Sequence, residues 1–247
     1  MIRLDKYLAD LGFGTRTQVK ELIRKGAVCV EGAVQKSPEY KLDEKQAKVS
    51  VNGVPCLYER YRYYLLHKPA GVISATEDKR EKTVLSFLPK ELRKDIFPVG
   101  RLDKDTTGLL LLTNDGELAH RLLSPRKHVE KTYLATLEKE VSEEDLRKLA
   151  EGVDIGEKKK TLPAHAEYVE DRNHVLLTIQ EGKFHQVKRM FEAVGNHVTA
   201  LKRLSMGPLR LEGELKEGCY RTLTDREREL LAVEKRTDSR PAHDFWE

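Results

Sequence analysis

The segment from Val99 to Gly116 constrains the fold of this chain more than any other stretch. It begins with a polar, glycine-flanked loop that carries Arg101, Asp103 and Asp105. A run of leucines at 109–112 follows and ends at an Asn-Asp-Gly turn signal. An apolar run this short favours a buried strand over a helix. A loop held against such a strand can present a carboxylate at a fixed place in the mouth of a cleft.

The composition excludes several classes of protein. The chain has 247 residues, enough for one large domain or two modest ones. Lys and Arg number 45 against 41 Asp and Glu, so the chain is no polycation, and a nucleic-acid site would depend on where the basic residues lie. The N-terminus is charged, and no apolar run approaches the ~20 residues of a membrane span. We expect a soluble, cytoplasmic protein with no membrane contact.

The cysteines and histidines predict neither a disulfide framework nor a metal site. Cys29, Cys56 and Cys219 are widely separated and form no Cys-x-x-Cys pair, which suits a reducing compartment. The histidines show no His-Glu-x-x-His spacing. We therefore expect a protein that binds no metal.

Residues 1–60 are typical of a small module with two helices followed by short strands. Thr15 and Gln18 predict a capping box at the start of the second helix. A spacing of four places three basic side chains on one face of this helix, namely Arg16, Lys20 and Arg24. Such a stripe on its own is more often a solvated surface than a binding site, so its function depends on the rest of the chain.

The remaining sequence divides into three parts. Residues 54–62 contain a proline and a polar run, and predict a linker. Residues 63–233 alternate strand and helix patterns and form the second domain. Residues 234–247 are polar and without periodicity, so we expect a disordered tail.

Three motifs, in order along the chain, resemble those of RNA pseudouridine synthases, specifically the RsuA family that acts on small-subunit ribosomal RNA. They lie at 100–116, 124–137 and 181–198, and the N-terminal module resembles the S4 RNA-binding domain. The resemblance covers about residues 1–232. It implies an α+β protein with an S4-like RNA-binding domain and a catalytic domain, the latter built on a mixed, largely antiparallel sheet with a central cleft.

The resemblance also implies roles for three side chains in catalysis. Asp103 is the essential carboxylate, which either attacks C1′ of the ribose or takes a proton from the sugar. Tyr133 stacks on the target uracil and could accept its C5 proton. Lys188 pairs with Asp103 and keeps that carboxylate ionised, although Arg189 is an alternative partner. Asp105 shares the loop of Asp103 and is better explained as an Asx-turn former.

Several basic or imidazole side chains are expected to contact RNA. Arg101 would hold the flipped nucleotide with its planar guanidinium fork. Ser124 to His128 reads as a phosphate-contacting loop beside a strand. The full predicted set is Arg101, Arg16, Lys20, Arg24, Lys68, Arg126, Lys127, His185 and Arg189.

The implied reaction is the isomerisation of one uridine of 16S rRNA to pseudouridine, of the uridine-516 type. It breaks the C1′–N1 bond, rotates the bound uracil and joins C5 to C1′, and it requires no cofactor and no metal. The partner is small-subunit ribosomal RNA, free or within an assembling 30S particle. We expect a monomer, because no exposed apolar stripe requires a partner.

Three alternatives remain open at this point. The same fold could act on 23S rRNA. The chain could instead be a non-catalytic S4-type RNA-binding protein, although such a protein would need neither Asp103 nor Tyr133. Asp103 and Asp115 could form the carboxylate pair of a glycoside hydrolase, but Asp115 lies in a turn at the far end of the leucine run.

Overall fold

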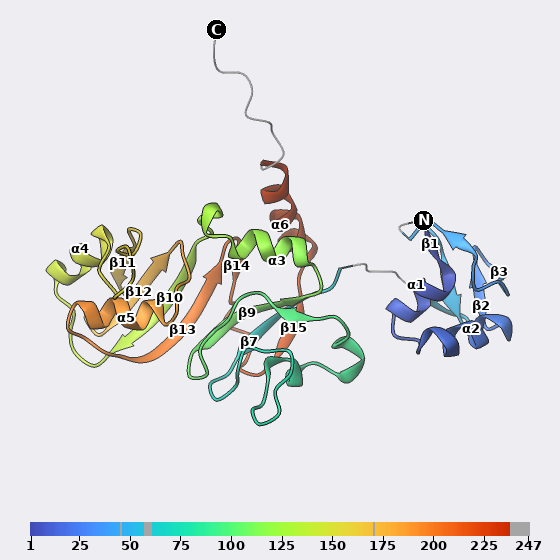
Figure 1. Ribbon diagram of the computed structural model, residues 1–247, viewed down its shortest axis with the longest axis horizontal. Coiled ribbons are helices and arrows are strands. Elements are labelled where there is room, and N and C mark those ends of the chain that lie inside the picture. The colour runs from blue at the N-terminus through green and yellow to red at the C-terminus, as the bar shows by residue number, and fades with distance from the viewer. Residues whose placement is uncertain (45, 57–60, 170, 238–247) are drawn as a thin grey trace, which may run out of the picture. The chain divides into compact units, whose positions relative to one another are not determined.

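The computed structural model describes residues 1–44, 46–56, 61–169 and 171–237 (Figure 1). It divides into two compact units. The first contains Met1–Arg62 together with Pro89–Lys94, and the second contains Tyr63–Leu88 and the chain from Asp95 onward. Within the described ranges, no helix is long and apolar enough to cross a membrane.

The N-terminal unit packs two helices against small sheets. Its elements are β1 (Ile2–Arg3), α1 (Leu4–Asp10), α2 (Arg16–Arg24), β2 (Val28–Val30), β3 (Ala33–Val34), β4 (Lys41–Leu42), β5 (Val49–Val51) and β6 (Val54–Cys56). Strands β3, β2, β5 and β6 form an antiparallel sheet in that order, and β1 pairs with β4. Tyr7, Leu8, Val19 and Ile23 are fully buried in the core of this unit.

The predicted capping box begins helix α2. The backbone N–H of Gln18 donates to Thr15 Oγ1 over 3.3 Å, and the backbone N–H of Thr15 donates to Gln18 Oε1 over 2.8 Å. These two bonds satisfy N–H groups that the first helical turn leaves without partners. The predicted linker is wrong at its start, because residues 54–56 pair with β5 as strand β6, while residues 57–60 lie outside the described part.

The second unit is built on one large sheet. Its strands are β7 (Tyr63–Lys68), β8 (Phe97–Pro98), β9 (Thr107–Thr113), β10 (Lys131–Leu137), β11 (His165–Tyr168), β12 (His174–Ile179), β13 (Val198–Met206), β14 (Leu209–Arg210) and β15 (Tyr220–Thr222). The order is β11-β12-β10-β13-β9-β7-β15, with β14 on β13 and β8 on β9. Only β13 and β9 run parallel among these pairs, which confirms the predicted α+β fold with a mixed, largely antiparallel sheet.

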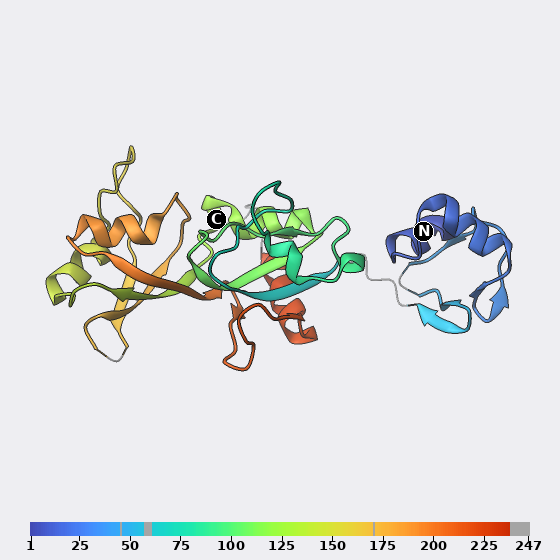
Figure 2. The same ribbon diagram turned by 90° about the horizontal axis from the view of Figure 1, so that it is seen from below.

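Helices and 3₁₀ turns cover this sheet. They are η1 (Val84–Phe87), α3 (Gly116–Leu123), η3 (Pro125–Lys127), α4 (Glu143–Glu151), α5 (Gln186–Ala193) and α6 (Asp225–Thr237), whereas η2 (Lys90–Leu92) belongs to the first unit. Figure 2 shows α5 lying over one face of the half-sheet that contains β10 and β13. In the other half, α3 and α6 share a core with the fully buried Leu109 and Leu111 of β9. Residues 234–237 belong to α6, so this part of the predicted disordered tail is helical.

The two halves of the sheet join where β9 and β13 run parallel. The register pairs are Lys202 with Thr107 and Arg203 with Gly108. Gly108 has a φ of +109°, and a Cβ there would collide with the backbone of Arg203. Arg203 is buried, and its Nε donates to the carbonyl oxygen of Leu109 over 2.8 Å. Glycine is therefore required at 108, and the loop that precedes it is fixed against β13.

Candidate active site

A cleft opens at this junction and is lined from both halves of the sheet. The loop before β9, the strands β10, β12 and β13, and the beginning of α5 all contribute. The lining residues are Arg101, Leu102, Asp103, Thr106, Tyr133, Ile179, His185, Gln186, Val187, Lys188 and Leu201. The structure thus brings together five predicted site residues, namely Arg101, Asp103, Tyr133, His185 and Lys188.

The loop that carries Asp103 is held by hydrogen bonds to the segment after β7. Ser74 Oγ donates to the carbonyl oxygen of Leu102 over 2.8 Å and accepts the N–H of Leu102 over 3.0 Å. The N–H of Gly71 donates to the carbonyl oxygen of Lys104 over 2.8 Å. Asp103 therefore sits on a backbone that is fixed on both sides, as a pre-organised site requires.

Lys68 is the third anchor of this loop. Its side chain is 0% exposed, and Nζ donates to the carbonyl oxygens of Pro69, Lys104 and Thr106 over 3.0, 3.3 and 2.8 Å. Burial lowers the pKa of Lys68 to about 8, against the attraction of nearby carboxylates. The predicted RNA contact of Lys68 is wrong, because a fully buried ammonium offers no surface to a phosphate.

Two cationic or imidazole side chains approach the carboxylate of Asp103. Lys188 Nζ lies 3.4 Å from Asp103 Oδ2, and His185 Nε2 lies 3.5 Å from Asp103 Oδ1. Both come from the start of α5, where His185 adopts a left-handed φ of 49° just before the first helical residue. Because the side chain of Asp103 is only 29% exposed, the charge of Lys188 acts on it with limited screening by water.

Asp105 has a different environment from the one predicted. Its two oxygens accept from Lys188 Nζ over 2.7 and 2.8 Å, so it is a long-range ion-pair partner rather than an Asx-turn former. The hydrogen bond from Lys188 lowers the pKa of Asp105. Burial on its own would lower the pKa of Lys188, but the hydrogen bond and charge of Asp105 and the charge of Asp103 outweigh it and raise that pKa.

Arg189, the alternative partner of Asp103, is engaged elsewhere. Its Nη1 donates to Glu157 Oε1 and to the carbonyl oxygen of Phe184, each over 3.0 Å, and its Nη2 donates to the carbonyl oxygen of Ile155. The geometry thus places Lys188, not Arg189, beside Asp103. It also ties the loop around Ile155 to the beginning of α5.

Tyr133 lies on the middle strand of the half-sheet and is nearly buried. It sits on β10 opposite Leu177 of β12 and Arg203 of β13. The alternation along β10 turns Tyr133 toward the buried side of the sheet, where it lines the cleft with Ile179 and Leu201. One wall of the cleft is therefore aromatic and apolar, which suits the flat face of a base.

The other predicted RNA contacts lie outside this cleft. Arg126 and Lys127 are exposed on η3 and do not line it. Arg16 and Arg24 are exposed and Lys20 is half-buried on α2 of the N-terminal unit, opposite the buried Val19 and Ile23.

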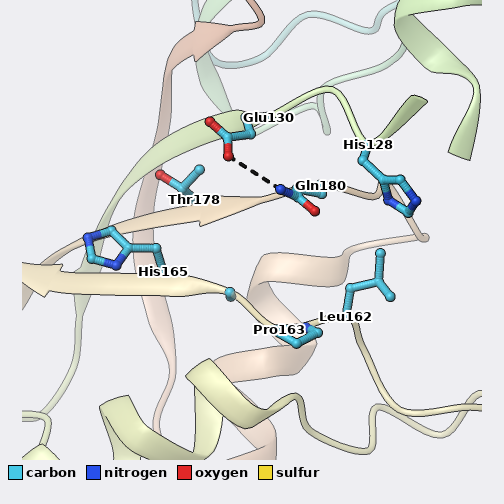
Figure 3. Close-up of a pocket in the computed structure, with 8 residues that line it drawn as sticks. His128, Glu130, Leu162, Pro163, His165, Thr178 and Gln180 are labelled. Atoms are coloured by element: carbon cyan, nitrogen blue, oxygen red, sulfur yellow. Dashed lines mark hydrogen bonds between the residues drawn. The ribbon is translucent and has the colours of Figure 1, made fainter. Parts of the chain in front are cut away.

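A larger cavity of about 390 Å³ lies over the start of β11 and the end of β12, and it shares no lining residue with the cleft (Figure 3). Glu130 and Gln180 both line it and are joined by a hydrogen bond of 3.3 Å from Gln180 Nε2 to Glu130 Oε1. His128, His165 and Leu162 also line it. In the described part of the chain, no group of three His, Cys, Asp or Glu side chains is placed to hold a metal.

Sequence reasoning missed the residues that brace the cleft. Glu181 accepts from Gln186 Nε2 over 2.8 Å and from the N–H of Leu162 over 2.9 Å. Gln186 in turn accepts the N–H of Lys183 over 2.9 Å and is buried. These bonds shape the turn that leads into α5. No periodicity or spacing in the sequence distinguishes such a Glu or Gln from an exposed one.

A mixed sheet that opens into a central cleft with an aspartate at its mouth is the architecture expected for the catalytic domain of a pseudouridine synthase. Comparison with known proteins supports this class. Residues 62–193 match the family model for RNA pseudouridylate synthase, and residues 2–48 match that for the S4 domain. The chain belongs to the RNA pseudouridylate synthase family and is a pseudouridine synthase with an S4 domain.

Individual relatives cover nearly the whole chain. A Bacillus subtilis (strain 168) protein, described as the uncharacterized RNA pseudouridine synthase YtzG, is 51% identical over 234 residues, which cover 93% of this chain and 98% of the relative. Ribosomal small subunit pseudouridine synthase A of Escherichia coli (strain K12) is 42% identical over 228 residues, which cover 92% and 98%. A crystal structure of a pseudouridylate synthase matches with a TM-score of 0.67 and 40% identity, covering 94% of this chain and 100% of that one. These relatives confirm the resemblance to the RsuA family.

Proposed function

We propose that this enzyme converts one uridine of 16S ribosomal RNA, of the uridine-516 type, to pseudouridine. The relatives that support this substrate are named as ribosomal small subunit synthases, among them the proteins of Escherichia coli and Haemophilus influenzae. The observation that carries the mechanism is the cleft in which Asp103 faces Lys188 while Tyr133 lines the apolar wall.

The reaction exchanges one bond for another without a net change in atoms. The C1′–N1 bond breaks, the uracil turns within the cleft, and C5 bonds to C1′. The proton on C5 leaves, and N1 acquires a proton. Asp103 acts on the ribose as its carboxylate, whether it attacks C1′ or removes a sugar proton, and either role requires the ionised form. Lys188 places its positive charge 3.4 Å from that carboxylate.

The remaining cleft residues hold the nucleotide. Tyr133 stacks on the uracil and receives the C5 proton, and its near-complete burial keeps water from that face of the base. Arg101 is exposed at the rim and binds the phosphate or ribose of the flipped nucleotide. Arg126, Lys127 and the α2 stripe bind RNA outside the cleft.

The test is release of tritium from C5-labelled uridine in 16S rRNA, presented free and within assembling 30S particles. The wild type should release tritium and Asp103→Asn should release none. Asp171→Asn is a matched control, because Asp171 lies in the turn between β11 and β12 and asparagine can also accept from the N–H of Asn173. If only labelled 23S rRNA releases tritium, the assignment of 16S rRNA as the substrate is wrong. If neither rRNA releases tritium, the assigned reaction is wrong.

A further inference from the structure

Phe184 is a large apolar side chain left open at the rim of the cleft. It is 70% exposed, although it directly precedes His185 and Gln186, which line the cleft. An exposed phenyl ring is unfavourable in water, and folding usually buries it. A single exposed apolar residue is common on protein surfaces, so the exposure of Phe184 matters because the ring adjoins two residues of the cleft.

The backbone of Phe184 is fixed while its ring is free on one face. Its carbonyl oxygen accepts from Arg189 Nη1 over 3.0 Å. One face of the ring stacks on His185, with ring centroids 3.8 Å apart and an angle of 18° between the planes. His185 Nε2 lies 3.5 Å from Asp103 Oδ1. A continuous stack of two rings thus leads outward from the candidate catalytic carboxylate.

Among the described residues, the unpaired positive charge beside this stack belongs to the lysines at 158–160, since Lys183 pairs with Glu181 and Arg189 pairs with Glu157. Lys183 Nζ donates to the carbonyl oxygen of Lys160 over 3.3 Å, and Arg189 Nη2 donates to that of Ile155. These bonds hold the exposed lysines at 158–160 next to the segment that carries Phe184. An aromatic ring bordered by cations is the arrangement that binds single-stranded nucleic acid, in which bases stack and phosphates meet lysines.

We propose that the open face of Phe184 stacks on an unpaired base of the substrate RNA next to the target uridine. This inference rests on the proposed function, because flipping a uridine into the cleft removes the stacking partner of its neighbour. Phe184 and His185 replace that partner with a rigid surface. Since every base has a π-face, the platform recognises an unstacked base rather than a particular sequence.

The first experiment compares kinetics on labelled rRNA. Loss of one base–aromatic stack corresponds to a factor of roughly 5 to 150 in affinity, so Phe184→Ala should raise KM by that factor and leave kcat within about twofold. Phe184→Trp should keep the wild-type KM, because tryptophan also has a π-face. Phe184→Leu should raise KM as Phe184→Ala does, because leucine is apolar but has no π-face. Val169→Ala is the control, since Val169 is also exposed but follows β11 away from the cleft.

The second experiment identifies the stacked base. Once the modified uridine is mapped, fragments containing it are made with an abasic site at each neighbouring position. At one position, the wild type should have a higher KM for the abasic fragment than for the intact one. Phe184→Ala should have the same KM for both fragments, because it already lacks the ring that stacks on that base. 2-Aminopurine at the same position should be quenched on binding by the wild type and not by Phe184→Ala.

These outcomes separate the two hypotheses. Tritium release by the wild type with an unchanged KM and an unchanged fluorescence in Phe184→Ala would overturn the stacking role and leave the proposed function intact. Absence of release from every rRNA would overturn the proposed function instead, and the stacking role, which rests on it, would fail with it.

Discussion

Lys188 Nζ lies 2.7 Å from Asp105 Oδ1 and 3.4 Å from Asp103 Oδ2, so one ammonium serves two carboxylates of the same loop. The closer partner is the more exposed one, since the side chain of Asp105 is 72% exposed and that of Asp103 is 29% exposed. The tighter geometry therefore belongs to the pair that water screens more. The looser pair involves the carboxylate that faces the cleft.

Lys188→Met should reduce kcat/KM by a factor on the order of 100, because Asp103 loses the cation that lies 3.4 Å from its carboxylate and the electrostatic pre-organisation that it provides. Lys188→Arg should retain part of the activity. Tritium release under single-turnover conditions measures the effect, and Lys148→Met on the exposed face of α4 is the control. Full activity of Lys188→Met would rule out a role for this pair.

Asp105→Asn should reduce activity far less than Asp103→Asn. Asp105 competes with Asp103 for Lys188, and its removal leaves the ammonium free to approach Asp103. We expect kcat within roughly fivefold of the wild type, since an exposed ion pair is worth less than about 1 kcal/mol. A loss comparable to that of Asp103→Asn would show that Asp105 itself acts on the substrate.

Lys68 should make stability depend on pH in the alkaline range. Its pKa is about 8 in the folded protein and 10.5 in the unfolded chain, so the unfolded chain binds more protons between these values. Stability should therefore rise with pH across this window, by about 3 kcal/mol in all from this group, and the penalty for the charged form should persist below pH 8. Urea unfolding of the wild type and of Lys68→Met from pH 7 to 10.5 measures the difference in slope. Equal slopes would contradict the assignment.

Gly108→Ala should destabilise the catalytic domain by about 2–4 kcal/mol, because the new Cβ collides with the Arg203 backbone at a positive φ. Gly195→Ala is the matched control, since Gly195 has a φ of +80° and an added Cβ there meets nothing within 4 Å. The control variant should lose only about 1 kcal/mol of unfolding free energy, because alanine is disfavoured at a positive φ but meets no neighbour there. Similar thermal midpoints for the two variants would contradict the predicted collision.

Replacement of Arg16, Lys20 and Arg24 by alanine should flatten the salt dependence of RNA binding. Each lost phosphate contact lowers the slope of log K against log salt by roughly 0.7 to 0.9. Filter binding to 16S rRNA at several salt concentrations measures it, with Lys139, Arg147 and Lys148 replaced together as a charge-matched control. An unchanged slope would mean that the α2 face is only a solvated surface.

The elements that the sequence predicts well are those set by neighbouring residues. The capping box at Thr15 and Gln18 and the leucine run at 109–112 each encode an element within a few positions, and the structure contains α2 and β9 there. The three family motifs likewise indicated the cleft, because each motif is local even though the cleft is not.

The errors concern contacts between distant residues. Lys68 looks like an exposed lysine beside a turn, and only the carbonyl oxygens of Lys104 and Thr106 make its burial tolerable. Asp105 has the context of an Asx turn, and its partner Lys188 lies 83 positions away. Residues 54–56 carry a proline and look like a linker, but β5 supplies the pairing that turns them into a strand.

The three carbonyl oxygens around the ammonium of Lys68 form the kind of cage that loops in other proteins build around a potassium ion. Here the caged cation is part of the polypeptide. It cannot dissociate when the ionic composition of the cell changes, and no chelator can extract it. This anchor of the loop that carries Asp103 is therefore covalently attached, whereas acylation of the Lys68 amine in the unfolded chain would remove the anchoring charge permanently.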